Sequence, residues 1–245
     1  MCSCTIAHRH YSTLYRTVNR WPINNAMRID EIELSKIAKE PSGDLGIYKM
    51  GDYLEKRGLK VLGYGAEAVV AMPEHGKYVL KIFKKGSKYA DFVRFAIQHQ
   101  GNKHLPRFHR TVRDLPGTGF SYVTMGLLSP ANEDDLTDEF LPELYGLIQL
   151  GMKNRIRAMQ PWYSTTVNQA LKARGIDPFS MASPAIFKKR CESKLGRSPD
   201  AGWMQAVDLI MKEAKKLGMD SLDIHPDNLM MDGSTLVLPD PFFDQ

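Results

Sequence analysis

Residues 223–228 of this 245-residue chain are Asp223-Ile224-His225-Pro226-Asp227-Asn228, and a second acidic residue, Asp240, follows within Leu238-Pro239-Asp240-Pro241-Phe242. Carboxylate and amide oxygens are the ligands that hold Mg²⁺ beside phosphate groups, and a neighbouring carboxylate can orient an attacking hydroxyl. The pattern therefore predicts a phosphoryl-transfer site. In it, Asp223 orients the hydroxyl, and Asn228 and Asp240 hold the metal.

The residues around this stretch predict how its side chains are brought together. Asp232-Gly233 lies between two short apolar runs, which favours a tight hairpin over residues 229–238 and places Asn228 and Asp240 at neighbouring strand ends. Upstream, apolar residues recur at helical spacing from Trp203 to Leu217. We expect a buried helix there, with Ser198-Pro199 as its cap and first position and Gly218 as its end.

The first half of the chain has the pattern of an antiparallel sheet. Turn residues separate apolar segments at 59–64, 66–72 and 78–83, and two further segments at 106–112 and 120–127 predict a fourth and a fifth strand. Helical patterns at 27–39, 45–58 and 91–100 flank these strands. The segment 152–196 is polar and interrupted by proline and glycine, so we expect irregular helices and loops that either shape a substrate site or cover the domain.

The 223–228 stretch resembles the catalytic loop of the protein-kinase-like superfamily. Protein kinases have D-L-K-P-E-N there, and the aminoglycoside and choline kinases have D-x-H-x-x-N. Asp240-Pro241-Phe242 stands where kinases have D-F-G, with the Asp kept and the Gly lost. The segment starting Gly63-Tyr64-Gly65-Ala66 resembles the glycine-rich loop, and Val79-Leu80-Lys81 resembles the strand that carries the kinase lysine. In these features the chain is similar to the early serine/threonine kinases of short-tailed (autographivirus-type) bacteriophages.

This resemblance implies an α+β, two-lobed, protein-kinase-like fold. The small lobe would have five antiparallel strands and a helical prelude over residues 27–126. A mainly helical, truncated large lobe would occupy residues 127–245, with the catalytic loop and the 152–196 insertion. We expect residues 1–26 to be a disordered extension. Cys2, Cys4, His8 and His10 within it could hold Zn²⁺, but their spacing is not one that structural zinc sites use.

The resemblance also implies the site residues and the cofactors, ATP and Mg²⁺. Asp223, His225 and Lys81 would be catalytic, and Asn228 and Asp240 would bind the metal. The nucleotide would contact Gly63, Tyr64, Gly65, Ala66 and Lys81, and adenine would meet backbone groups of the hinge at Met125 and Leu127. Without the resemblance, Lys81 would be an ordinary solvent-facing lysine of a strand, and the glycines an ordinary hairpin turn.

The chain departs from the kinase pattern in three ways. Between Lys81 and Gln100 there is no Glu to hold the lysine, so we expect Gln98 or Gln100 to bond it instead. Leu222 precedes Asp223 where regulated kinases have Arg, and the sequence ends five residues after Asp240, without an activation segment. We therefore expect activity that needs no activating phosphorylation.

Three functions remain open at this point. The first is an ATP- and Mg²⁺-dependent serine/threonine kinase, encoded by a phage and acting on host proteins. The second is a small-molecule phosphotransferase of the aminoglycoside or choline kinase kind, which His225 favours. The third is a pseudokinase that grips a partner, which the missing Glu favours. The sequence leaves the substrate and the oligomeric state open.

Composition limits the partners. The net charge of +5 is scattered along the chain, which does not favour nucleic acid binding. No apolar run approaches the roughly 20 residues that span a bilayer, and three cysteines form no disulfide framework. We expect a cytoplasmic protein, in the host cytoplasm if phage-encoded, whose partners are host protein substrates and not membranes.

Overall fold

The structure, a computed structural model, describes residues 46–73, 76–115, 117–159 and 161–243. The predictions for residues 1–26, including the zinc alternative, and for a helix at 27–39 lie outside these residues. Within the described chain, residues 46–97 and 107–127 form one compact unit, and residues 98–106 and 128–243 form another.

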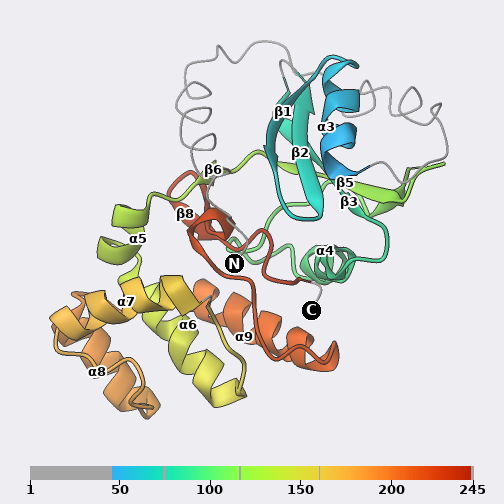
Figure 1. Cartoon of the computed structure of the whole chain (residues 1–245). Helices are drawn as coiled ribbons and strands as arrows, with labels where there is room; N and C mark the ends of the chain where they lie inside the picture. The colour runs from blue at the N-terminus through green and yellow to red at the C-terminus, as the bar shows by residue number, and fades with distance from the viewer. Residues whose placement is uncertain (1–45, 74–75, 116, 160, 244–245) are drawn as a thin grey trace. The chain divides into compact units, whose positions relative to one another are not determined.

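The helices and strands carry the labels of Figure 1. Those of the first unit are α3 (Ile47–Glu55), β1 (Leu59–Tyr64), β2 (Ala68–Pro73), β3 (Tyr78–Lys84), α4 (Lys88–Gln98), β4 (Arg113–Asp114) and β5 (Phe120–Gly126). Those of the second are β6 (Ser129–Pro130), α5 (Glu133–Asp138), α6 (Leu141–Asn154), α7 (Pro161–Ala173), α8 (Pro184–Lys194), α9 (Ala201–Lys216), the 3-10 turn η2 (Pro226–Asn228), β7 (Met230–Asp232) and β8 (Thr235–Val237).

The first unit is built on an antiparallel sheet of five strands in the order β1-β2-β3-β5-β4. β3 is central and is buried from Val79 to Phe83, because β2 and β5 flank it and helices pack on the unit. Residues paired across the strands share a face of the sheet. Lys81 therefore lies on the same face as Val70 of β2 and Val123 of β5.

Helix α3 covers the opposite face. Its apolar residues Ile47, Met50 and Leu54 form one core cluster with Leu80 and Ile82 of β3. Figure 1 shows α3 lying along β1 and β2. The turn that follows the helix contains Gly58, whose φ of +80° is a conformation that other residues adopt only at a cost.

The predicted strands at 59–64, 78–83 and 120–127 are confirmed to within one residue at their ends. The predicted fourth strand at 106–112 is wrong, because the short strand β4 comes later and only an isolated bridge joins Phe108 to Met125. In this segment His109 N donates to Thr124 O, and Gly126 N donates to Arg107 O. It therefore follows β5 through single hydrogen bonds instead of a regular ladder.

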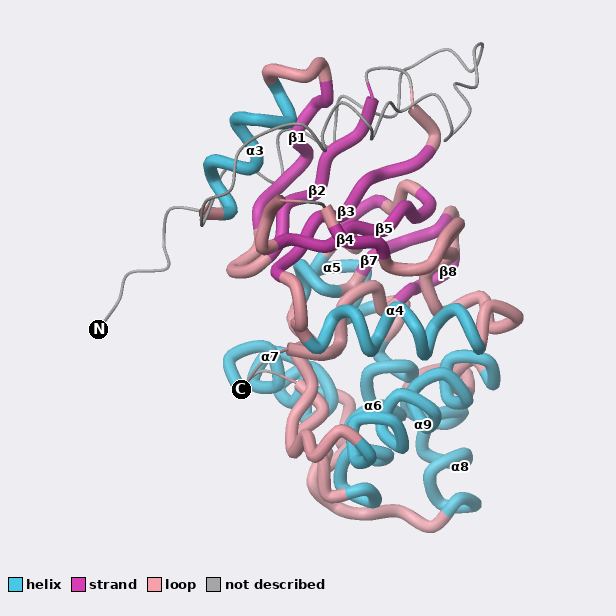
Figure 2. Tube along the Cα trace, turned by 90° about the vertical axis from the view of Figure 1, so that its right-hand side faces the viewer, coloured by secondary structure: helices cyan, strands magenta, loops and turns pink. Residues whose placement is uncertain are grey.

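The second unit is mainly helical, with α6 and α9 packed side by side in both Figure 1 and Figure 2. α5 and α6 are two separate helices, because Pro142 lies in the first turn of α6 and cannot continue a preceding helix. The expectation of irregular structure across 152–196 is wrong in part, because α7 and α8 are regular helices of 13 and 11 residues. The proline that begins each of them takes the first helical turn, where no N–H is needed.

A buried polar network fixes the start of α9. Asp200, not Ser198, caps this helix, and its carboxylate accepts from the backbone N–H groups of Gly202 and Trp203. Glu143 is 2% exposed and accepts two hydrogen bonds from Arg197, at 2.6 and 2.7 Å. Glu143 also accepts from the N–H of Asp200, so one buried carboxylate of α6, with its hydrogen bonds satisfied, is joined to the start of α9.

The predicted hairpin is confirmed. β7 and β8 pair around Gly233, whose φ is +61°, and β6 adds a third strand beside β7. The fold-class prediction is also confirmed: the chain is α+β, with a five-stranded antiparallel sheet in one unit and a mainly helical second unit. No helix among the described residues has the length and apolar character to cross a membrane.

Candidate functional site

The turn that carries Asp223 is shaped by alternation of buried and half-exposed residues. Leu222 and Ile224 are buried, whereas Asp223 and His225 keep 29% and 24% of their side-chain surface. The turn then closes on itself, because Asn228 N donates to His225 O at 2.9 Å. Apolar anchors thus hold the backbone while the polar side chains stay accessible.

Asn228 is the centre of the hydrogen bonding. Its Nδ2 donates to the backbone oxygen of Asp223 at 2.9 Å, to Oδ2 of Asp223 at 3.1 Å and to the backbone oxygen of Asp240 at 3.3 Å. All three partners are acceptors, so the nitrogen of the amide must face them. The amide oxygen of Asn228 consequently points away from these groups and is the atom suited to a metal.

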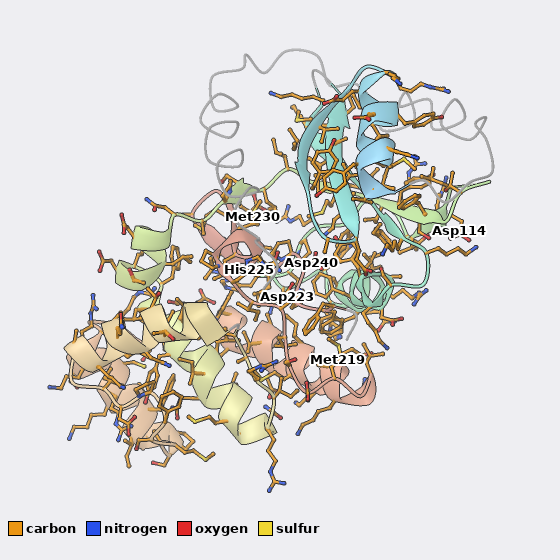
Figure 3. All side chains as sticks on the ribbon, viewed as in Figure 1. Asp114, Met219, Asp223, His225, Met230 and Asp240 are labelled. Atoms are coloured by element: carbon orange, nitrogen blue, oxygen red, sulfur yellow. The ribbon has the colours of Figure 1, made fainter. Side chains whose placement is uncertain are left out.

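A second link joins the turn to the segment after the hairpin. Asp223 N donates to Pro241 O at 3.0 Å, and the neighbouring Phe242 is 2% exposed. Figure 3 shows Asp223, His225 and Asp240 gathered at one place in the second unit. The structure therefore brings together the four residues that the sequence predicted there, from the turn and from beyond the hairpin.

His225 lies beside the carboxylate of Asp223, with 3.9 Å between Nε2 and Oδ1. The residue also begins the 3-10 turn, since its extended backbone (φ −144°, ψ 169°) precedes Pro226. This separation exceeds that of a hydrogen bond. His225 can therefore influence Asp223 by its charge, when protonated, more than by orienting it.

The donor set suits a hard cation shared with phosphate. Among the described side chains, no group of three or more His, Cys, Asp or Glu residues could hold a metal ion. Mg²⁺ does not need such a group, because it is commonly held by one or two protein oxygens with phosphate oxygens and water completing the shell. The carboxylate of Asp240 and the amide oxygen of Asn228 fit that requirement.

The predicted glycine loop is a tight turn between β1 and β2. Gly65 N donates to Ala68 O at 2.7 Å, and Gly63 pairs with Val70 just after an irregularity in β1. A Cβ added to Gly65 would meet no atom closer than 3.8 Å, and its φ is not positive. The turn itself therefore does not require glycine at this position, which leaves close approach of a ligand as a reason for it.

Tyr64 is turned toward α3. Its ring lies 5.2 Å from that of Tyr48, and its hydroxyl occupies the space where a side chain at Gly51 would be. Burial, with the nearby carboxylates of Glu55 and Asp52, raises the pKa of the Tyr64 phenol. A ligand at this turn would meet the backbone of Tyr64 before its phenol.

Lys81 is 8% exposed, so the alternative of a solvent-facing lysine is wrong. Its Nζ lies over the ring of Tyr89, 3.8 Å from the ring centroid. Tyr89 is in the first turn of α4 and was not singled out from the sequence. An aromatic residue eight positions after a strand lysine is a weak signal, because core aromatics are common at such positions. The prediction that Gln98 or Gln100 bonds Lys81 stays a prediction.

The hinge residues lie at the end of β5. Met125 pairs with Val79 of β3 and is 5% exposed, and its Sδ accepts a hydrogen bond from the Tyr89 hydroxyl at 3.8 Å. Leu127 follows the strand and is partly exposed. Nothing in these contacts tests whether either residue meets adenine.

Comparison with known proteins adds little. No family model matches the sequence, and no curated protein matches it. Among solved structures, the chain is similar to a crystal structure of the aminoglycoside phosphotransferase APH(4)-Ia, with a TM-score of 0.33 and 12% identity over 78% of this chain and 70% of that one. A likeness this weak carries no functional argument, so any functional proposal rests on the residues described within each unit.

Proposed function

We propose that this protein is a kinase-like phosphotransferase that moves the terminal phosphoryl group of ATP to a hydroxyl group of a substrate. The observation that carries the proposal is the hydrogen bonding of Asn228 to both Asp223 and the backbone of Asp240. These bonds support a carboxylate for the acceptor and two oxygen ligands for a metal, brought together from the 223–228 turn and from the segment after the hairpin. Such a set is what phosphoryl transfer asks of a protein.

In the proposed reaction, the substrate hydroxyl oxygen forms a bond to the γ-phosphorus, and the bond from that phosphorus to the β–γ bridging oxygen breaks. ADP leaves with the electron pair of the broken bond. The Asp223 carboxylate orients the hydroxyl and accepts its proton. Asn228 holds Asp223 in place through its amide nitrogen.

Mg²⁺ would be held by Asp240 and the amide oxygen of Asn228, and it would supply neutralisation of phosphate charge. In the first unit, Lys81 would add a positive charge for the phosphates, and the turn at Gly65 would admit them close to the backbone. The burial of Lys81 supports this role, since an ammonium group is seldom removed from water without a purpose.

For the acceptor we infer serine or threonine side chains of proteins, with the chain encoded by a phage and acting on host proteins in the host cytoplasm. The resemblance of the glycine loop, the catalytic turn and the Asp240-Pro241 pair to the phage kinases supports this choice. A small-molecule phosphotransferase is the second candidate, favoured by the D-x-H-x-x-N pattern that His225 completes. A nucleotide-gripping module without catalysis is the third.

One experiment separates the three candidates. The purified chain is incubated with γ-labelled ATP, Mg²⁺ and bacterial lysate, and label is followed in proteins and in small metabolites. Label in proteins supports the protein kinase, label in metabolites alone supports the small-molecule enzyme, and neither supports the binding module. Asp223→Asn, run in parallel, must remove the label for it to be assigned to this chain.

A further inference from the structure

Lys81 presents a physical problem that the fold must solve. Its side chain is in the middle of the central strand, flanked by Val70 and Val123, and only 8% of it reaches solvent. A buried ammonium group costs free energy unless something on the protein compensates for the lost water. In kinases that this chain resembles, a glutamate from the following helix does so, but α4 carries none.

The structure places an aromatic face at the lysine instead. The 3.8 Å between Lys81 Nζ and the centroid of the Tyr89 ring is well inside the roughly 6 Å range of a cation–π interaction. Tyr89 is 5% exposed, so both partners are largely removed from water. Such interactions are strongest where water does not compete.

The ring is held firmly by its own neighbours. Phe83 of β3 packs edge-on against it at 4.9 Å and 75°, and Phe108 does the same at 6.4 Å and 77°. Phe92, one turn along α4, lies 6.0 Å away, and the Tyr89 hydroxyl donates to Met125 of β5. Contacts from two strands, a connecting segment and the helix itself therefore fix the plane of the ring.

We propose that Tyr89 is a positioning residue of Lys81, whose ammonium group it holds over the face of its ring. This inference rests on the proposed function, because it assumes that Lys81 serves the phosphates of ATP. A neutral ring contacts the ammonium without itself adding a negative charge beside it. It also ties α4 to the sheet by packing, which an ion pair alone does not.

The first test asks whether the contact exists, with no nucleotide present. Protons held over an aromatic face shift upfield in NMR spectra, so the ε-methylene signal of Lys81, assigned by its loss in Lys81→Met, should be shifted upfield. Tyr89→Phe should keep this shift and Tyr89→Leu should abolish it. Phe95→Leu is the matched control, since it removes a buried ring from the same helix but should keep the shift. An unshifted wild-type signal overturns the proposal.

The second test asks whether the contact serves ATP. We expect Tyr89→Leu to raise the Kd for Mg²⁺-ATP about tenfold, and Tyr89→Phe to stay within about twofold. In the Lys81→Met background, Tyr89→Leu should change the Kd by less than about twofold, because the group it positions is gone. Thermal melts of every variant show how much of each sample is folded, so that the Kd values can be compared for folded protein.

The outcomes are distinct. If Tyr89→Leu weakens ATP binding equally with and without Lys81, Tyr89 acts only by packing and the positioning role is overturned, while the phosphotransferase proposal stands. If the wild-type chain neither binds ATP nor transfers its phosphate, the proposed function fails and the positioning role with it. Coupling between the two substitutions, together with rescue by Tyr89→Phe, supports the role.

Discussion

The side-chain amide of Asn228 donates to both the backbone oxygen and the carboxylate of Asp223, at 2.9 and 3.1 Å, although the two residues are five positions apart in the sequence. The carboxylate that would accept a proton is thus held by the residue that would also bind the metal. Two roles of the proposed reaction are coupled through one amide group. Substitution of the proton acceptor and substitution of a metal ligand should therefore impair different properties of the protein.

Replacing Asp223 by Asn should lower turnover by on the order of 10²–10⁴ while leaving ATP binding in place. The new amide has the size of the carboxylate and can still accept from Asn228, but it cannot take the proton of a substrate hydroxyl. Steady-state kinetics and nucleotide titration on the same preparation measure both quantities. An equal loss of nucleotide affinity would contradict the assigned role.

Replacing Asp240 by Ala should raise the Mg²⁺ concentration needed for half-maximal activity and weaken binding of Mg²⁺-ATP, since one of two protein ligands is lost. Asp138→Ala is a suitable control, because the Asp138 side chain is 79% exposed and its ion pair with Arg174 lies at the surface. The control should titrate like the wild type. An unchanged Mg²⁺ titration for Asp240→Ala removes Asp240 from the metal site.

Replacing Gly65 by Ala should leave stability unchanged but weaken ATP binding, because the added Cβ meets only ordinary contacts in the protein yet would face the ligand. Gly58→Ala is the control, and it should have the reverse pattern of effects. Because the backbone of residue 58 has a φ of +80°, alanine there should lower the free energy of unfolding by about 1–2 kcal/mol without changing ATP binding per folded molecule. Denaturant melts and nucleotide titration distinguish the two. If Gly65→Ala binds ATP normally, the glycine is not there for the ligand.

Asp200 should control acid stability. Hydrogen bonds from Lys103 and from His104 hold the pKa of its carboxyl well below the usual range, against the opposing effect of burial. A depressed folded-state pKa contributes stability that is complete above the unfolded value near 4 and is lost as pH falls below it. Asp200→Asn should keep the helix cap but flatten this acid loss, whereas Asp200→Ala should lose about 1 kcal/mol more at pH 7. Chemical denaturation from pH 2 to pH 7 gives both results, and identical acid profiles for wild type and Asp200→Asn would contradict the assignment.

Cys191 should be an unreactive thiol in the folded protein. Burial, with the carboxylates of Glu143 and Glu192, raises its pKa to about 11, and the side chain is fully buried. The thiolate is the reactive form, so very little of it exists at pH 8. In a Cys2→Ser/Cys4→Ser variant, reaction with a disulfide reagent at pH 8 should be slow until urea unfolds the chain. Rapid labelling without urea would place Cys191 at an accessible site.

The sequence determined the features that depend on local pattern. The spacing from Asp223 to Asn228 is short enough for one turn to bring the side chains together, and Asp232-Gly233 favours a hairpin whatever surrounds it. The strands predicted at 59–64, 78–83 and 120–127 were readable for the same reason, since turn residues bound each apolar run. The turn and hairpin that carry the candidate site residues, and the core strands of the first-unit sheet, were therefore predictable.

Only the tertiary structure decided the contacts between segments distant in sequence. The segment after α4 follows β5 by single hydrogen bonds and not as a strand, and a local pattern cannot show this because the partners at 124–126 belong to another strand. α7 and α8 are helices although their composition is polar: α7 packs against α6, and α8 is capped by Ser183 and contacts α6 through the Phe187 and Tyr145 rings. The cap of α9 is Asp200 because Lys103 and His104 reach it from elsewhere. The ring over Lys81 belongs to the same class: pairing a cation with an aromatic face needs three-dimensional proximity, which no spacing in the sequence encodes.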